Sequence, residues 1–408
     1  MNWTNRLQTE KLMNTYLDHL QPYPFAKLEQ LFRDLTPAAA KARIALSIGE
    51  PQHESPAFVL RAISDNLHRI ANYPSTAGLP ELRSTIALWL KGRYRLPDID
   101  PDTQVLPVSG TREALFSFAQ TVVAANSTAL VMSPNPFYQI YEGAALLAGA
   151  TPHFINCTEA SGLLPDFSSV TEQQWQQCQL LYLCNPGNPT GALMPIEQFQ
   201  SIIRLAQEHD FVIASDECYS EIYFDEESPP PGLLQACVAM DNHDYRNCVV
   251  FHSLSKRSNL PGLRSGFVAG DAQILRGFLQ YRTYHGCAMP LHHQLGSIAA
   301  WSDEHHVIAN RQQYRDKFAA VMTELEGHLP VALPEAGFYL WPKTPVSDIE
   351  FARQLYAEEN VIVLPGRFLA RESGGVNPGE NRVRMALVAK IEDCVEAARR
   401  IAQYLEKG

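Results

Sequence analysis

Short runs of consecutive apolar residues, separated by stretches with helical periodicity, constrain the fold of this chain most strongly. The runs carry Val, Ile, Leu and Phe at adjacent rather than alternate positions, which is typical of strands buried on both faces. Helical periods between them, such as Arg112–Ala125 and Ile196–His209, imply strand–helix–strand units and a mostly parallel sheet. The expected strands are Gln104–Val108, Ala129–Ser133, Leu180–Cys184, Phe211–Ser215, Cys248–His252 and Gly266–Gly270.

The pattern changes after Tyr281, where a long polar helical region (292–329) precedes a mixture of strands and helices. This α+β pattern predicts a second, smaller domain. We expect an N-terminal arm that is part of the small domain (1–48), a large domain (49–290) and a small C-terminal domain (291–408). Within the last part we expect strands at Gly337–Trp341, Val361–Leu364 and Arg382–Leu387, and helices at Asp348–Glu359 and Ile391–Leu405.

The composition and the net charge exclude several classes of protein. Of the 408 residues, 46% are hydrophobic and 19% are charged, which excludes a disordered chain. The net charge of −11 argues against nucleic acid and an anionic membrane as partners. The start, Met1–Arg6, has no signal-peptide pattern, no apolar run is long enough to span a membrane, and the eight cysteines form no C-x-x-C pair. We therefore expect a cytoplasmic small-molecule enzyme or a protein-binding module, with no metal site.

A lysine follows directly on a buried strand. Lys256 comes four residues after the expected strand Cys248–His252, with Ser253 and Ser255 before it and Arg264 eight residues after it. A solvated basic loop would explain a lone lysine. At the end of a buried strand, however, α/β proteins place their chemistry, and a lysine beside other cations has a lowered pKa. Such an amine can form a Schiff base with a carbonyl.

Three other strand ends carry polar groups. Asp216 ends one strand, where it could cap a turn or meet a buried cation. Asn185 and Asn188 lie in a rigid proline-containing loop, and Gly110 opens a helix whose N–H groups suit a phosphate, although turn and cap chemistry could explain both. Together with Lys256, these groups match the ring nitrogen, ring oxygen, phosphate and aldehyde of pyridoxal 5'-phosphate.

With these motifs the chain resembles the fold-type I pyridoxal-phosphate enzymes, specifically the class I/II aminotransferases. The likeness rests on N-P-x-N-P-T-G (185–191), S-D-E-x-Y (215–219) and S-L-S-K-x-x-N-L-P-G-L-R-x-G (253–266). It implies an α/β fold in which a large domain has a mostly parallel seven-stranded sheet between helices and a small domain is α+β. It also implies a ping-pong amino transfer between an amino acid and a 2-oxo acid, with 2-oxoglutarate and glutamate as the expected pair.

The resemblance assigns a role to each cofactor-binding position. Lys256 matches the lysine that forms the internal aldimine, and Asp216 matches the aspartate on the pyridine nitrogen. Tyr219 and Asn188 match the donors to the 3'-oxygen, and Tyr138 matches the ring stacked on the cofactor. The positions that match phosphate ligands are Ser253, Ser255, Arg264, Gly110, Thr111 and Arg112.

Other matches concern the substrate and a second subunit. Arg384 matches the arginine that binds the substrate α-carboxylate, beside Asn188, and Gly49 matches the glycine whose backbone lines the same pocket. Arg382 is the second candidate, because strand alternation would put it on the same face as Arg384. Tyr73 matches a tyrosine that reaches the phosphate of the neighbouring subunit, which implies a homodimer with shared active sites.

A finer resemblance concerns the substrate. The segments Leu20–Leu28, Tyr281–Met289 and Ala299–Val307 look like those of bacterial N-succinyldiaminopimelate aminotransferases. The implied reaction converts N-succinyl-LL-2,6-diaminopimelate and 2-oxoglutarate to N-succinyl-2-amino-6-oxopimelate and glutamate, a step of lysine biosynthesis. The alternatives are a broader aspartate, alanine or aromatic aminotransferase, and a carbon–sulfur β-lyase that would share every cofactor residue. A regulator with an aminotransferase-like domain is disfavoured by the negative charge.

Overall fold

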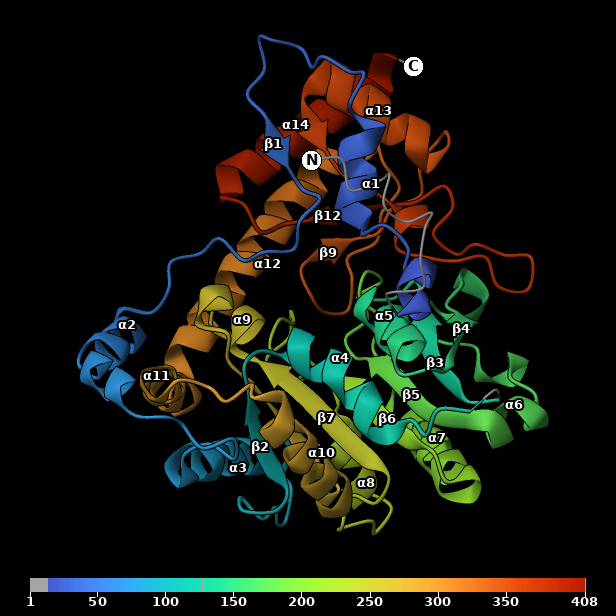
Figure 1. Cartoon of the computed structure of the whole chain (residues 1–408). Coiled ribbons are helices and arrows are strands. Elements are labelled where there is room, and N and C mark those ends of the chain that lie inside the picture. The colour runs from blue at the N-terminus through green and yellow to red at the C-terminus, as the bar shows by residue number, and fades with distance from the viewer. Residues whose placement is uncertain (1–13, 127, 408) are drawn as a thin grey trace.

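The computed structural model describes residues 14–126 and 128–407, so the segment Met1–Arg6 lies outside the described residues. Its main feature is a seven-stranded sheet of order β2-β8-β7-β6-β5-β3-β4 (Figure 1), in which β8 alone runs antiparallel to the other six strands. The expected α/β fold with a mostly parallel sheet is confirmed. The strands are β2 (Val105–Val108), β3 (Leu130–Asn135), β4 (Thr151–Asn156), β5 (Cys178–Cys184), β6 (Val212–Asp216), β7 (Cys248–Ser253) and β8 (Gly266–Gly270).

Helices cover both faces of this sheet, because neighbouring apolar residues of a strand point to opposite faces. On β7, Val249 and Phe251 belong to one core, and Cys248 and Val250 belong to the other. The first core is closed by α4 (Thr111–Val122), α5 (Ile140–Leu147) and α10 (Ala272–His285). The second is closed by α3 (Pro80–Tyr94), α7 (Ile196–His209), α8 (Leu233–Val238) and α11 (Leu291–Trp301), with α6 (Glu172–Gln177) at its edge.

A second, smaller unit lies above the large sheet in Figure 1 and is built from both ends of the chain. Its antiparallel sheet has the order β11-β12-β9, and a separate parallel pair joins β1 to β10. The strands are β1 (Ile44–Ala45), β9 (Tyr339–Leu340), β10 (Val361–Ile362), β11 (Leu364–Pro365) and β12 (Val383–Ala386). The helices are α1 (Pro24–Leu31), α12 (His305–Leu325), α13 (Asp348–Glu359) and α14 (Ile391–Lys407).

The expected domain bounds, 1–48, 49–290 and 291–408, stay predictions. Helix α11 packs on α2 (Ala57–Ser64) and on α3, and its Ala300 and Trp301 belong to the core of the large sheet. Tyr314 and Phe318 of the next helix, α12, belong to the core of the smaller unit. We therefore propose that the second boundary falls after Trp301.

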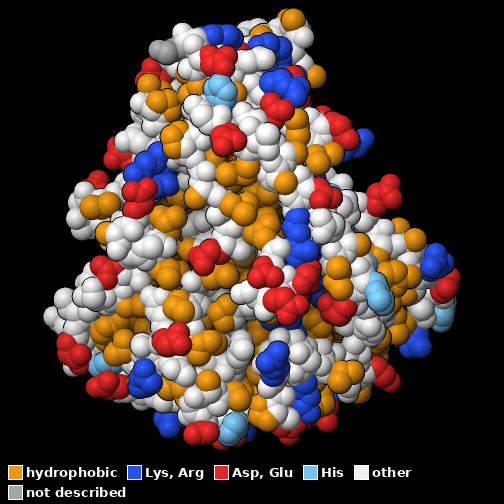
Figure 2. Space-filling view, turned by 180° about the vertical axis from the view of Figure 1, so that it is seen from behind, with side chains coloured by type: hydrophobic (Ala, Val, Ile, Leu, Met, Phe, Trp, Pro, Cys, Tyr) orange, Lys and Arg blue, Asp and Glu red, His pale blue; other side chains and the backbone are white. Residues whose placement is uncertain are grey.

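Two general features complete the fold. All eight cysteines lie in the described part of the chain and are free thiols. No helix among the described residues is long and apolar enough to cross a membrane. On the face shown in Figure 2, acidic and basic side chains are intermixed, and hydrophobic ones gather between the upper and lower parts of the molecule.

Candidate active site

The carboxyl ends of β5, β6 and β7 meet below the smaller unit and border a cavity of about 490 Å³. Most predicted site residues line it together. They are Gly49, Thr111, Arg112, Tyr138, Asn188, Asp216, Tyr219, Ser253, Ser255, Lys256, Arg264 and Arg384. Gly110 lies next to Thr111, and its Cα faces the Arg264 guanidinium. Tyr73 is fully exposed and is not among the lining residues.

Lys256 lies in the short helix α9 (Leu254–Arg257), which follows β7 without a loop. Its Nζ donates a hydrogen bond to the carbonyl oxygen of Gly49 at 2.7 Å. Burial lowers the pKa of the amine to about 8, and the nearby Arg384 acts in the same direction. At neutral pH, Lys256 therefore exists partly as the free amine that a Schiff base requires.

Asp216 ends β6 and is buried. Its carboxylate accepts hydrogen bonds from Tyr141 Oη at 2.8 Å and from the Cys218 N–H at 3.3 Å. Burial raises the pKa of this carboxyl, and within residues 14–126 and 128–407 it forms no ion pair. A buried carboxylate of this kind is suited to a cationic partner that enters with a ligand. Tyr141 carried no sequence motif and was missed, although it lies only three residues after Tyr138.

Gly110 and Arg264 form one end of the cavity. Gly110 has φ +89°, and a Cβ on it would lie 2.2 Å from Arg264 Nη2, so only glycine allows this approach. The Arg264 guanidinium donates to the Pro261 carbonyl at 2.9 Å and forms no ion pair with a described residue. The N-terminus of the twelve-residue helix α4 also opens here. A free guanidinium beside a helix N-terminus is an anion site.

Arg384 lines the same cavity from β12, a strand of the smaller unit. Its Nη2 donates to the Ser47 carbonyl at 2.8 Å, and its Nη1 donates to Asn188 Oδ1 at 3.2 Å. Its Nε is buried and has no hydrogen-bond partner in the described structure. The guanidinium lies over the ring of Tyr339, whose hydroxyl is 3.0 Å from that of Tyr219. Tyr339 was also missed, because its expected strand carried no polar motif.

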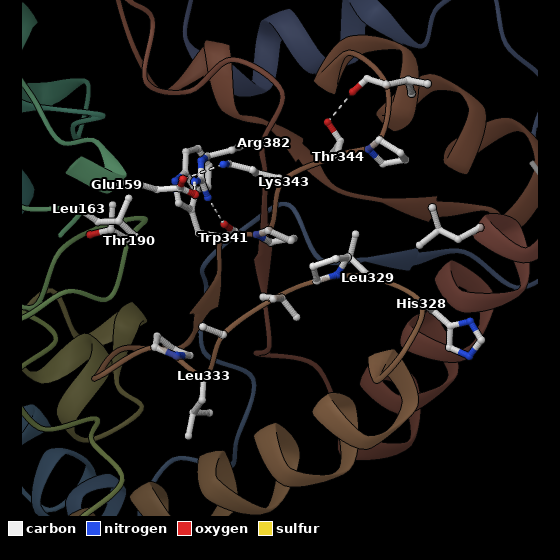
Figure 3. Close-up of a pocket in the computed structure, with 18 of the residues that line it drawn as sticks. Glu159, Leu163, Thr190, His328, Leu329, Leu333, Trp341, Lys343, Thr344 and Arg382 are labelled. Carbon is white, nitrogen blue, oxygen red and sulfur yellow. Dashed lines mark hydrogen bonds and ion pairs between the residues drawn. The ribbon is translucent and has the colours of Figure 1, made fainter. Parts of the chain in front are cut away.

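Arg382 does not enter this cavity. Its guanidinium donates to the Trp341 carbonyl at 2.8 Å and to Glu159 at 2.6 Å. It lines a separate cavity of about 1000 Å³ (Figure 3), where Lys343 also pairs with Glu159. Arg382 directly precedes β12 and bridges to Lys343, but its contacts with Trp341 and Glu159 hold the guanidinium at the other cavity, so strand alternation alone did not predict where it lies.

The cavity therefore combines a lysine with a lowered pKa, a buried unpaired carboxylate and two separate arginine sites. The sequence profile of the aminotransferase class I and II family matches residues 41–401. The chain belongs to this family. A crystal structure of an aminotransferase from Neisseria meningitidis Z2491 has 48% sequence identity and a TM-score of 0.93, covering 96% of this chain and 100% of that chain.

Two further relatives have more specific descriptions. An LL-diaminopimelate aminotransferase of Aquifex aeolicus (strain VF5) is 31% identical, over 94% of this chain and 96% of the relative. A probable N-succinyldiaminopimelate aminotransferase from Thermus thermophilus is 27% identical, with a TM-score of 0.82, covering 93% of this chain and 99% of that chain. This aminotransferase therefore acts on amino acids and 2-oxo acids, and its fold-type I architecture is confirmed.

Aminotransferases of this family use pyridoxal 5'-phosphate, and the cavity fits that cofactor. The unpaired carboxylate of Asp216 suits a protonated ring nitrogen, and the free guanidinium of Arg264 beside Gly110 suits a phosphate. Lys256 Nζ lies in the same cavity with a lowered pKa. The assignment of each site residue to a part of the cofactor is a proposal.

Proposed function

We propose that this aminotransferase transfers the amino group of N-succinyl-LL-2,6-diaminopimelate to 2-oxoglutarate, a step of lysine biosynthesis in the cytoplasm. Two kinds of relative support a substrate with the diaminopimelate skeleton. The first are named for free LL-diaminopimelate, and the Thermus thermophilus relative is named for the N-succinyl form. The observation that carries the proposal is an unpaired cation, Arg112, at the mouth of the cavity.

The Arg112 side chain is exposed, and its Nε donates to Tyr138 Oη at 2.7 Å. It forms no ion pair with any residue of the described structure, and its guanidinium carbon is 6.0 Å from the centre of the Tyr23 ring. Asp216 and Glu50 supply the acidic groups of the cavity, and Asp216 is reserved for the cofactor. A guanidinium at this place suits a carboxylate at the far end of a long substrate.

The N-succinyl form fits this charge pattern better than free diaminopimelate does. Succinylation removes the distal ammonium group and adds a carboxylate. Free diaminopimelate would add a second ammonium group to a cavity that already holds four cationic side chains, with Glu50 as the remaining acidic one. We therefore assign the α-carboxylate to Arg384 and a distal carboxylate to the Arg112 side chain. The match of Arg112 to a phosphate ligand stays a prediction, which we assign to its backbone N–H in the first turn of α4.

The remaining residues are assigned by their contacts. Bound pyridoxal phosphate supplies a ring that takes up the electrons left at the substrate Cα. Lys256, with its pKa near neutrality, moves the proton from Cα as base and then as acid. Asp216 keeps the ring nitrogen protonated, and Tyr219 and Asn188 donate to the ring oxygen. Because Asn188 Oδ1 is bonded to Arg384, the amide N–H₂ group remains for that role.

A panel of single half-reactions tests the proposal. The absorbance of the bound cofactor is followed with N-succinyl-LL-diaminopimelate, LL-diaminopimelate, glutamate, aspartate, alanine and phenylalanine. We expect the N-succinyl compound to have the highest second-order rate constant for the half-reaction. A wide margin in favour of aspartate or phenylalanine would reject the diaminopimelate assignment, and a margin in favour of LL-diaminopimelate would reject the succinyl group. Pyruvate released from cystathionine would indicate a β-lyase.

We also propose a homodimer in which Tyr73 reaches the phosphate end of the partner's site. Tyr73 is fully exposed, and the apolar side chains of Leu67 and Ile70 on the preceding turns are exposed with it. Mixing inactive Lys256→Ala and Tyr73→Ala proteins should regain activity, because a mixed dimer holds one intact site. No regain after subunit exchange would contradict shared sites.

A further inference from the structure

A buried lysine of the smaller unit is linked to the backbone of Lys256 through two other side chains. Lys317 lies on α12 and is only 3% exposed. Its Nζ is 2.7 Å from His53 Nε2, and it also donates to the carbonyls of Leu387 and Val388. His53 Nδ1 is 2.7 Å from Asn310 Oδ1. None of these side chains lines the cofactor cavity.

The chemistry of the groups gives the chain of bonds one direction. Asn310 Nδ2 donates to the carbonyls of Lys256 and Arg257 at 3.2 and 3.3 Å, which fixes Oδ1 as the acceptor that faces His53. His53 must then carry its proton on Nδ1, so its Nε2 accepts from Lys317. Donors therefore run from Lys317 through His53 and Asn310 to the carbonyl of Lys256.

This chain of hydrogen bonds through Lys317, His53 and Asn310, which we call the relay, also joins the two segments that hold Lys256. The side chain of Lys256 donates to the carbonyl of Gly49, and His53 lies four residues further along the same segment. Asn310 holds the backbone of Lys256 from the other side. Asn310 and Lys317 are two turns apart on one face of α12, whose Phe318 belongs to the core of the smaller unit.

We infer that Lys317, His53 and Asn310 are positioning residues, which set the orientation of Lys256 relative to the Gly49 segment. The inference rests on the proposed role of Lys256. The relay has the features of a network that acts as a unit, because each member donates to the next and the loss of any member leaves buried polar groups unpaired. The charged and titratable groups beside it are Tyr314, Glu392 and Cys394.

The test uses the holoenzyme without substrate. The absorbance of the bound cofactor is titrated with pH, and the midpoint reports the proton affinity of the nitrogen that Lys256 contributes. We expect His53→Leu and Lys317→Met each to displace the midpoint by about half a pH unit or more, an approximately threefold change in that equilibrium. The double variant should move it no further than either single one.

Two matched variants act as controls. In His53→Gln, the side-chain amide can still accept from Lys317 and donate to Asn310, so the wild-type midpoint should return. Tyr314→Phe keeps the ring that packs on His53 at 4.6 Å and removes a hydroxyl with no partner in the described structure, so it should have no effect. A lower melting temperature of His53→Leu with an unchanged midpoint, or additive shifts in the double variant, would overturn the inference.

The same titration distinguishes this inference from the proposed function. Lys256→Met should remove the pH-dependent absorbance change altogether. If the change persists in that variant, the role of Lys256 is wrong. If it is lost there and is unaltered in His53→Leu, the proposed function stands and the relay is rejected.

Discussion

Replacing Arg384 by lysine tests whether its guanidinium binds the substrate α-carboxylate. Two of its nitrogens are bonded to Ser47 and Asn188, and Nε is buried without a partner among the described residues. A lysine keeps the charge but offers one nitrogen, so it cannot keep these contacts and also bind both carboxylate oxygens. A hydrogen bond to a charged group contributes about 1.5–3 kcal/mol, so the loss of one predicts a kcat/KM about 10- to 150-fold lower.

The assay is the half-reaction measured under single-turnover conditions with several amino acids. The loss should be similar for all of them, because every amino acid carries the α-carboxylate. Arg382→Lys is the matched control, since this arginine lies two residues away and lines the other cavity. We expect the control to stay within about threefold of the wild type, because it touches no group of the proposed site. Equal losses in the two variants, or no loss in Arg384→Lys, would refute the assignment.

Two further predictions concern the cofactor end of the cavity. Gly110→Ala would place a Cβ 2.2 Å from Arg264, so cofactor affinity, measured by equilibrium dialysis, should fall about tenfold or more. The control is Gly92→Ala, which lies in open space on α3. It should leave cofactor affinity unchanged and stabilise the helix by about 0.5–1 kcal/mol. Burial lowers the pKa of Lys256 from 10.5 to about 8. Between pH 8 and pH 10.5, Lys256 is therefore protonated in the unfolded chain and largely neutral in the folded one. The cofactor-free protein should then gain stability as the pH rises through this range. Because Lys256 is not fully buried, we expect the gain in unfolding free energy to be about 1–2 kcal/mol. Urea unfolding at both ends of the pH range should show this gain in the wild type and not in Lys256→Met. An equal gain in the variant would contradict the lowered pKa.

The residues that the sequence could locate were those whose signal is local. Lys256 and Asp216 each end an apolar run, so the rule that α/β proteins carry chemistry at strand ends was sufficient to find them. Tyr141 could not be found in this way, because its contact with Asp216 depends on how α5 packs over the sheet. The relay of His53, Asn310 and Lys317 has no local signal either, since its members come from two distant segments.

The same distinction holds for the fold. Central strands such as β7 were recognised because both of their faces are apolar, whereas β4 was missed. This edge strand pairs with β3 alone, is mostly half-exposed, and carries Pro152 and His153 in place of an apolar run. The sequence predicts one long helical region over 292–329, but the structure interrupts it between Trp301 and His305. The helices on either side, α11 and α12, belong to different cores.

The pairing of β1 with β10 has a consequence for the order of events during synthesis. Ile44 leaves the ribosome roughly 300 residues before its partner Val361, a delay of about 15–60 s at usual elongation rates. The seven strands of the large sheet, all between residues 105 and 270, emerge within that time. We expect the large sheet to acquire protection before Ile44 and Leu46 do, which hydrogen exchange of ribosome-bound chains that end shortly before Val361 can measure. Until Val361 and Ile362 have emerged, β1 has no strand to pair with.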